Sequence, residues 1–261
     1  MPVPHDIVTT LRAAGCVFAE DEAELLLASA RSPADLDAMV ARRVLGHPLE
    51  HVLGWACFGG VRVAVDAGVF VPRRRTEFLV ERATALAPRG GRAVVVDLCC
   101  GTGALGAALV TALDGGAAEL HAADIDPAAV RCARRNVAPL GGLVHEGDLY
   151  AALPAGLRGR VDVLLANVPY VPTGEVGLLP QEARLHEALV ALDGGADGLD
   201  VLRRVAAGAG RWLAPSGVLL SETSGRQADA AARVLADAGL TARVETDEEL
   251  YATVVTGTRT D

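Results

Sequence analysis

The sequence predicts an α/β fold with a mainly parallel sheet, and three observations carry this prediction. Short apolar runs alternate with segments of helical periodicity over most of the 261 residues. A glycine-rich turn follows one of these runs directly, and an Asn-Val-Pro-Tyr segment follows another. Strands that alternate with helices favour βαβ units, whose sheet is covered by helices on both faces.

The first 50 residues predict a small helical domain. Two groups of apolar residues recur there at helical spacing: Ile7, Val8, Leu11 and Ala14, then Ala23, Leu26, Leu27 and Ala30. Ser32-Pro33 and Gly46-His47-Pro48 punctuate this pattern, so we expect little room for further helices between them. Residues 51–75 are expected to form a connecting β-hairpin that turns at Gly59-Gly60, and residues 76–261 form the main domain.

The main domain is expected to alternate strands with helices. The pattern predicts strands at 94–98, 120–123, 143–145, 161–165 and 218–220, helices at 199–209 and 227–238, and a last strand pair of antiparallel character at 242–244 and 251–256.

A glycine turn follows the first of these strands. Residues 94–98 run into Cys99-Cys100 and then into Gly101-Thr102-Gly103, where a helix begins. Glycines let the backbone approach a ligand closely, and open α/β sheets bind ligands at the carboxyl ends of their strands. A dinucleotide phosphate is one ligand that such a turn could hold, although the preceding Cys-Cys makes this a loose match to the dinucleotide fingerprint.

Acidic residues follow the next two strands. Asp124 ends the strand at 120–123, where a carboxylate can accept both ribose hydroxyls of a nucleoside. Asp126 precedes Pro127 and is the expected N-cap of the following helix. Asp148 follows the strand at 143–145 and could accept a hydrogen bond from an adenine amino group, or it could cap a loop.

The segment Asn167-Val168-Pro169-Tyr170 follows the apolar strand at 161–165. Val168 precedes a proline, which biases its backbone to an extended conformation, so its carbonyl can point the same way as the Asn167 side chain. Two such acceptors would bind a planar NH2 group through both hydrogens, with the ring of Tyr170 lying against it. A plain turn out of the strand is the alternative reading.

Together these segments resemble the class I S-adenosylmethionine-dependent methyltransferases, and within them the protein-glutamine N-methyltransferases that modify peptide release factors and a ribosomal protein. Residues 70–77 resemble that family's Pro-Arg-Pro-Glu-Thr-Glu segment, and residues 187–199 resemble its segment ending in Leu-Asp-Gly-Gly. The chain departs from the pattern at Val168, where the family has proline, and at Arg74 and Arg75, where it has Pro-Glu.

The resemblance implies a Rossmann-like class I methyltransferase sheet, S-adenosylmethionine as cofactor and S-adenosylhomocysteine as product. It implies catalytic roles for Asn167, Val168, Pro169 and Tyr170. It implies cofactor contacts from Asp97, Gly101, Thr102, Gly103, Asp124, Ile125, Asp148, Leu149 and Asn167. The implied activity is methyl transfer to a glutamine side-chain amide of a protein or peptide. A small-molecule amine or amide, or adenine, is the alternative acceptor, and a degenerate cofactor-binding scaffold is the non-enzymatic alternative.

Composition limits the kinds of partner and the cellular location that we expect. The net charge of −9 opposes a nucleic-acid substrate, because such binding relies on Lys and Arg against phosphate. Five cysteines without zinc spacing favour reduced thiols and no metal site. The chain has no apolar run of membrane-spanning length, and its amino terminus shows no basic stretch followed by an apolar core. We therefore expect no secretory signal, and a cytoplasmic protein without a membrane partner. A smaller helical domain than is usual in the family suggests an acceptor other than the usual release-factor loop.

Several further residues carry expectations. Arg73-Arg74-Arg75 is expected to form a solvated turn or an ion pair with Glu77. Trp55, Trp212 and His121 are expected to pack. Tyr150 and Phe70 could each line the cofactor pocket or the core, and Glu222 could touch either the substrate or a neighbouring loop.

Overall fold

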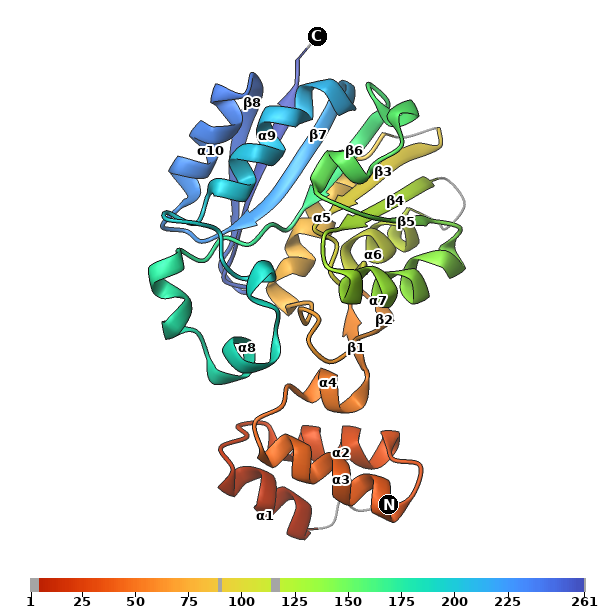
Figure 1. Cartoon of the computed structure of the whole chain (residues 1–261), viewed down its shortest axis with the longest axis vertical. Coiled ribbons are helices and arrows are strands. Elements are labelled where there is room, and N and C mark those ends of the chain that lie inside the picture. The colour runs from red at the N-terminus through yellow and green to blue at the C-terminus, as the bar shows by residue number, and fades with distance from the viewer. Residues whose placement is uncertain (1–4, 89–90, 114–117, 261) are drawn as a thin grey trace.

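The structure is a computed structural model that describes residues 5–88, 91–113 and 118–260. Residues 1–4, on which the expectation about a secretory signal partly rests, lie outside this range. Figure 1 shows a helical group at one end of the molecule and a twisted sheet flanked by helices at the other. The expected α/β class and its mainly parallel sheet are confirmed.

Four helices form the amino-terminal group: α1 (His5–Ala13), α2 (Ala19–Ser29), α3 (Pro33–Val44) and α4 (Leu49–Leu53). They pack around a core of their own, which includes Leu11, Leu26 and Met39. The expectation of little room after Ser32-Pro33 is wrong, because α3 fills 12 residues there. The Ser32 side chain accepts a hydrogen bond from the Asp35 N–H and Pro33 occupies the first turn, so this pair starts a helix.

The predicted hairpin follows, with β1 (Trp55–Phe58) paired antiparallel to β2 (Val61–Ala64). Gly59 and Gly60 turn between them with φ of 53° and 77°, which few other residues tolerate. A short 3-10 turn, η1 (Arg74–Thr76), then leads into α5 (Glu77–Leu86).

The main sheet has seven strands in the order β5-β4-β3-β6-β7-β9-β8. Their bounds are β3 Ala93–Leu98, β4 Ala118–Asp124, β5 Leu143–Glu146, β6 Val161–Ala166, β7 Leu213–Thr223, β8 Leu240–Asp247 and β9 Ala252–Arg259. The five strands from β5 to β7 pair in parallel, and β9 runs antiparallel to both of its neighbours. The predicted antiparallel pair at the end of the chain is therefore confirmed.

Helices cover both faces of this sheet. One layer comprises α5, α6 (Ala104–Ala112) and α7 (Pro127–Val137), and the other comprises α9 (Asp200–Trp212) and α10 (Ala228–Asp237). All six residues of β3 are buried, as expected for a central parallel strand between two helical layers. Between β6 and α9 lies a segment with η5 (Thr173–Leu178), α8 (Gln181–His186) and η6 (Leu189–Ala191). Three more 3-10 turns are η2 (Ala138–Leu140), η3 (Leu149–Ala152) and η4 (Ala155–Leu157).

The chain order of the strands reverses between β3 and β6. The chain places β4 and β5 on one side of β3, and then places β6 and β7 on the other. The loops at the carboxyl ends of β3 and β6 therefore diverge and leave a crevice, which is where open α/β sheets bind ligands. Within the described residues, no helix has the length and apolar character needed to cross a membrane.

Candidate active site

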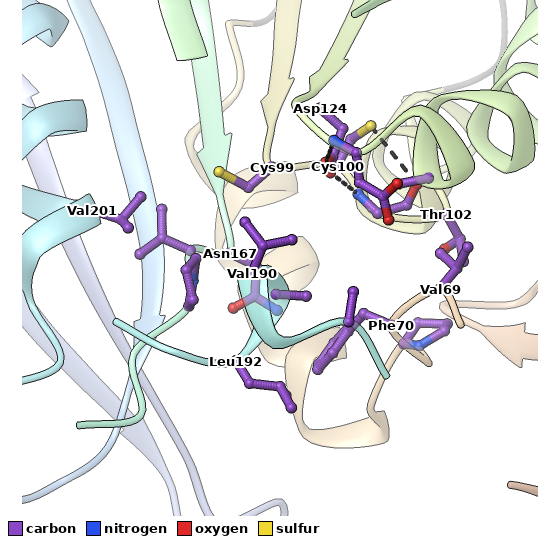
Figure 2. A pocket seen from close by; sticks show the side chains of 18 of the residues that line it. Val69, Phe70, Cys99, Cys100, Thr102, Asp124, Asn167, Val190, Leu192 and Val201 are labelled. Carbon is purple, nitrogen blue, oxygen red and sulfur yellow. Dashed lines mark hydrogen bonds between the residues drawn. The ribbon is translucent and has the colours of Figure 1, made fainter. Parts of the chain in front are cut away.

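A cavity of about 460 Å³ lies at the carboxyl ends of β3, β4 and β6. The residues that follow these strands form one side, and the rest of the lining comes from the segments at 69–76, 147–149 and 179–192 and from Val201 and Arg204 of α9. Figure 2 shows Asn167 and Val190 in the centre of the view, with Asp124 and Thr102 on one side and Phe70 and Leu192 below. The crevice that the sheet topology predicts is therefore the cavity that the structure contains.

The glycine turn after β3 bends sharply at three residues, Cys99, Gly101 and Gly103, whose φ angles are 55°, 54° and 74°. A Cβ on Gly103 would meet Val137 Cγ2 at 2.8 Å, so the turn lies tightly against α7. The backbone of Gly101 borders the cavity opposite Phe70. Small residues thus let the main chain form the wall of the cavity.

Asp97 supports this turn from beneath. Its side chain is 1% exposed, and its Oδ2 accepts a hydrogen bond of 2.9 Å from the Gly106 N–H at the start of α6. Burial raises the pKa of Asp97 to about 8, against the opposing effect of this hydrogen bond. Asp97 is not among the cavity-lining residues, so its carboxyl is placed to hold the turn and helix together.

Asp124 lies at the end of β4 and borders the cavity. Its Oδ2 accepts from the Gly101 N–H at 2.8 Å, and its Oδ1 accepts from the Asp126 N–H at 2.9 Å. Burial raises the pKa of Asp124, although these backbone hydrogen bonds oppose the shift. Asp126 caps α7 through the Ala128 N–H, which confirms its predicted N-cap role.

Asp148 also lines the cavity, and its carboxylate pairs with Arg204 of α9. The neighbouring Tyr150 turns away into the core, where its hydroxyl donates to the Val205 carbonyl at 2.7 Å and its ring stacks on Trp212. Of the two aromatic residues left open by the sequence, Phe70 therefore lines the cavity and Tyr150 packs in the core. His121 packs as expected, with its ring stacked on His145.

Asn167 directly follows β6, and its side-chain oxygen Oδ1 is buried without a hydrogen-bond partner among the described residues. Nearly all buried polar groups in proteins are hydrogen-bonded, so this acceptor on the cavity wall is available to a donor that enters the cavity. Val168 is 2% exposed, and no described residue donates a hydrogen bond to its carbonyl.

The segment that resembles Leu-Asp-Gly-Gly lies against the loop Asn167-Val168-Pro169-Tyr170. A Cβ on Gly194 would come within 2.6 Å of the Pro169 carbonyl oxygen, and one on Gly198 within 2.2 Å of the Tyr170 carbonyl oxygen. Only glycine leaves room for the carbonyls of this loop. The two motifs are therefore parts of one structural unit.

The arginine segment makes different contacts from those expected. Glu77 does not pair with it, because the Glu77 carboxylate accepts instead from the Gly59 N–H at 3.1 Å. Arg73 pairs with the buried Glu187, and Arg75 pairs with Glu222 of β7 at 2.9 Å. Both arginines line the cavity. Glu222 thus touches neighbouring loops, which is one of the two roles that the sequence left open.

Most of the residues singled out from the sequence converge on this cavity. Ten of the predicted catalytic and cofactor-binding residues line it: Gly101, Thr102, Asp124, Ile125, Asp148, Leu149, Asn167, Val168, Pro169 and Tyr170. Asp97 and Gly103 lie behind the wall. Sequence reasoning missed an apolar part of the lining, formed by Val190, Leu192 and Val201. The sequence contains a signal for this apolar part, namely the apolar run at 188–192 next to the Gly-Gly pair. That run was interpreted only as part of a family pattern.

The lining residues fit a nucleoside that carries a short side chain. Carboxylates at Asp124 and Asp148 face the cavity beside a backbone turn free of large side chains, which suits ribose and base groups, and apolar residues close the other side. The unpartnered oxygen of Asn167 marks the place where a second group would be held. The described part of the chain contains no cluster of three or more metal-ligating side chains.

Comparison with known proteins agrees with this geometry. The methyltransferase small domain family matches residues 60–198. The release factor glutamine methyltransferase of Deinococcus radiodurans is 39% identical over 211 residues, which cover 80% of this chain and 73% of that protein. A 4-amino-L-phenylalanine/4-methylamino-L-phenylalanine methyltransferase of Streptomyces pristinaespiralis is 37% identical over 208 residues, which cover 73% of this chain and 70% of that protein.

Comparison with solved structures agrees on the fold. The crystal structure of a ribosomal protein L11 methylase from Lactobacillus delbrueckii subsp. bulgaricus superposes with a TM-score of 0.51 over 72% of this chain and 81% of its own, at 16% identity. At that identity the likeness concerns the fold alone. With the family match and the curated relatives, it leads to one conclusion: the chain belongs to the methyltransferase small domain family, in the branch that contains the release factor glutamine methyltransferases.

Proposed function

We propose that this methyltransferase transfers a methyl group from S-adenosylmethionine to the side-chain amide nitrogen of a glutamine in a protein or peptide. The observation that carries the proposal is the buried, unpartnered Oδ1 of Asn167 on the cavity wall. The release factor glutamine methyltransferase among its relatives supports glutamine as the acceptor.

The residues that would hold the cofactor are those on the β3 and β4 side of the cavity. The Asp124 carboxylate would accept from ribose hydroxyls, the backbone of the turn at Gly101 would lie against the amino-acid part, and Asp148 would face the base. When bound, S-adenosylmethionine supplies an electrophilic methyl group on a sulfonium that is a good leaving group.

The work left to the protein follows from amide chemistry. An amide nitrogen is a poor nucleophile because its lone pair is delocalised into the carbonyl. Acceptance of its two N–H groups by Asn167 Oδ1 and the Val168 carbonyl would hold the nitrogen in line and favour the lone pair turning toward the methyl carbon. The same two acceptors would stabilise the positive charge that develops on nitrogen. Positioning of this kind can supply about 7–11 kcal/mol. The methylated nitrogen would give up its extra proton to solvent after transfer, so no general base is needed beforehand.

A small-molecule amine or amide is the second candidate acceptor. The relative from Streptomyces pristinaespiralis, whose name gives an amino-substituted phenylalanine as its substrate, supports this candidate. Val168 in place of the family's proline points the same way, because it keeps the carbonyl but frees φ and adds an N–H. Methylation of adenine in nucleic acid is disfavoured by the net charge of −9. For the location of the enzyme we propose the cytoplasm, where such acceptors and reduced cysteines are found.

The test begins with S-adenosylmethionine carrying a radioactive methyl group. The purified enzyme is incubated with it in a cell extract, and the label is followed into protein, nucleic-acid and small-molecule fractions. Purified release factor, a Gly-Gly-Gln peptide and 4-amino-L-phenylalanine then serve as defined acceptors. We expect label in protein or peptide, on glutamine. Label only in the small-molecule fraction selects the second candidate, and label only in nucleic acid refutes both.

A further inference from the structure

The hydroxyl of Tyr170 is held in a closed ring of three hydrogen bonds. It donates to Glu222 Oε1 at 2.7 Å and accepts from Arg75 Nη2 at 2.8 Å. Arg75 Nε donates to the same Glu222 oxygen at 2.9 Å. The ring joins η1, the loop after β6 and the end of β7, which are three separate parts of the chain.

Arg75 is the residue on which this ring of hydrogen bonds depends. The Glu222 side chain is only 2% exposed, and its second oxygen, Oε2, finds no partner among the residues described. A buried carboxylate is costly unless it is paired, and Arg75 is the cation that the structure pairs with it. Without Arg75, Glu222 would have to take up a proton or move, and Tyr170 would lose its contact with Arg75 and, where Glu222 moves, its contact with Glu222 as well.

The ring plane of Tyr170 is fixed from both ends. Its backbone carbonyl accepts from Gln227 Nε2 at 2.9 Å, while its hydroxyl is held by Arg75 and Glu222. Burial and the neighbouring Glu222 carboxylate raise the pKa of Tyr170, so the phenol stays neutral and remains a donor. Tyr170 lines the cavity together with Asn167, so the orientation of its ring helps to decide where a planar acceptor group can lie.

Position 75 is one of the positions at which this chain departs from the pattern of the family it resembles. The family's Pro-Arg-Pro-Glu-Thr-Glu pattern has glutamate there. A glutamate at that position would place a second carboxylate beside buried Glu222, and two like charges at such a distance repel. The adjacent Arg74 is exposed, and its side chain forms no ion pair or hydrogen bond with any described residue, so it offers a matched control.

We propose that Arg75 and Glu222 are a positioning pair that fixes the ring of Tyr170 against the acceptor. The proposal rests on the proposed function, in which Tyr170 lies against the group to be methylated. If the aromatic ring of Tyr170 were free to turn, the acceptor nitrogen would be displaced. A displacement of about 1 Å can cost on the order of 100-fold in rate.

The test uses tyrosine labelled with ¹³C at the ring carbon that bears the hydroxyl. The chain has three tyrosines, so its spectrum is simple. Tyr251 is 90% exposed and gives the position of a free phenol, Tyr150 gives that of a buried hydroxyl bonded to a carbonyl, and Tyr170→Phe assigns the third signal. Arg75→Glu is compared with Arg74→Glu, which makes the same change of charge one residue away. Arg75→Gln, with a milder change, serves if Arg75→Glu does not fold.

In Arg75→Glu or Arg75→Gln we expect the Tyr170 signal to move toward that of Tyr251, while Arg74→Glu leaves it in place. On the Gly-Gly-Gln peptide, kcat should fall about 10- to 100-fold with the affinity for S-adenosylmethionine unchanged. An unmoved Tyr170 signal in both Arg75 variants, or equal effects at positions 74 and 75, overturns the proposal. If the unaltered enzyme methylates no acceptor, the proposed function fails, and the Tyr170 signal still decides whether the pair holds the ring.

Discussion

Replacement of Asn167 by alanine should separate activity from stability. In most proteins, truncation of a buried asparagine destabilises the fold because hydrogen bonds are lost. Here Asn167 Oδ1 has no partner among the described residues, so the folded state already bears the cost of an unsatisfied buried acceptor. That cost is about 1–3 kcal/mol. Its removal offsets the lost packing, and we expect the free energy of unfolding of Asn167→Ala to stay within about 1 kcal/mol of the original or to rise.

Turnover should behave in the opposite way. If Asn167 accepts from the NH2 group of the acceptor in the transition state, its loss should lower kcat by roughly 100- to 1,000-fold. Affinity for S-adenosylmethionine should change much less, because Asp124 and the glycine turn are untouched. Urea denaturation gives the stability, calorimetry the cofactor affinity, and transfer of a labelled methyl group the turnover.

Asn136→Ala is the matched control. The Asn136 side chain accepts from the Ala64 N–H at 2.7 Å and donates to the carbonyls of Ala64 and Thr102 at 2.9 and 2.8 Å. The same substitution there removes three hydrogen bonds to backbone groups and should cost about 1–3 kcal/mol. If Asn167→Ala destabilises the protein as much as Asn136→Ala, or keeps near-full turnover, the reasoning about the orphaned oxygen is refuted.

Three further predictions concern the turn and its carboxylates. Asp124→Ala should weaken binding of S-adenosylmethionine about tenfold or more, because charge-assisted hydrogen bonds are lost. Calorimetry measures this affinity, and an unchanged value in a folded variant would place the ribose contact elsewhere. Because burial raises the pKa of Asp97 from 3.8 to about 8, its folded carboxyl keeps a proton that the unfolded chain releases. The contribution of this group to the free energy of unfolding is full below pH 3.8 and is lost as the pH rises through about 8. Asp97→Asn should therefore flatten the dependence of the free energy of unfolding on pH across this interval, measured by denaturation curves. An unchanged pH dependence would argue against the raised pKa. Gly103→Ala and Gly141→Ala share a φ of 74°, but only at Gly103 would the new Cβ meet a neighbour, at 2.8 Å. Gly103→Ala should therefore lose about 1–3 kcal/mol more than Gly141→Ala in urea denaturation, and equal losses would show that backbone strain alone decides.

Local signals predicted the sheet and the cavity well. The central strands read as continuous apolar runs because helices bury both of their faces, and the Asn167 and Asp124 positions follow from where those runs end. The helix α3 was missed because Ser32-Pro33 was interpreted as an interruption. The same two residues can end one helix or cap the next, and only the residues after them distinguish the cases.

Contacts between distant parts of the chain could not be predicted. The segment 73–75 was expected to form a solvated turn or an ion pair with the nearby Glu77. The partner of Arg75, Glu222, instead lies 147 positions away and is brought close because α5, which follows Arg75, packs against β7. Asp97 was expected to face the cofactor, but its side chain points from β3 to the start of α6. Which face a residue at a strand end uses depends on the register of the whole sheet, and the local sequence does not contain that information.

The central claim is that the methyl group goes to an NH2 group held at Asn167. The most direct measurement identifies the methylated atom by fragmentation mass spectrometry of the product formed from purified release factor or the Gly-Gly-Gln peptide, with the original enzyme and with Asn167→Ala compared side by side. The account predicts one added methyl group on the glutamine side-chain nitrogen, formed by the original enzyme and nearly absent with the variant. A methyl group on oxygen, sulfur or carbon, or equal methylation by the two proteins, would contradict it.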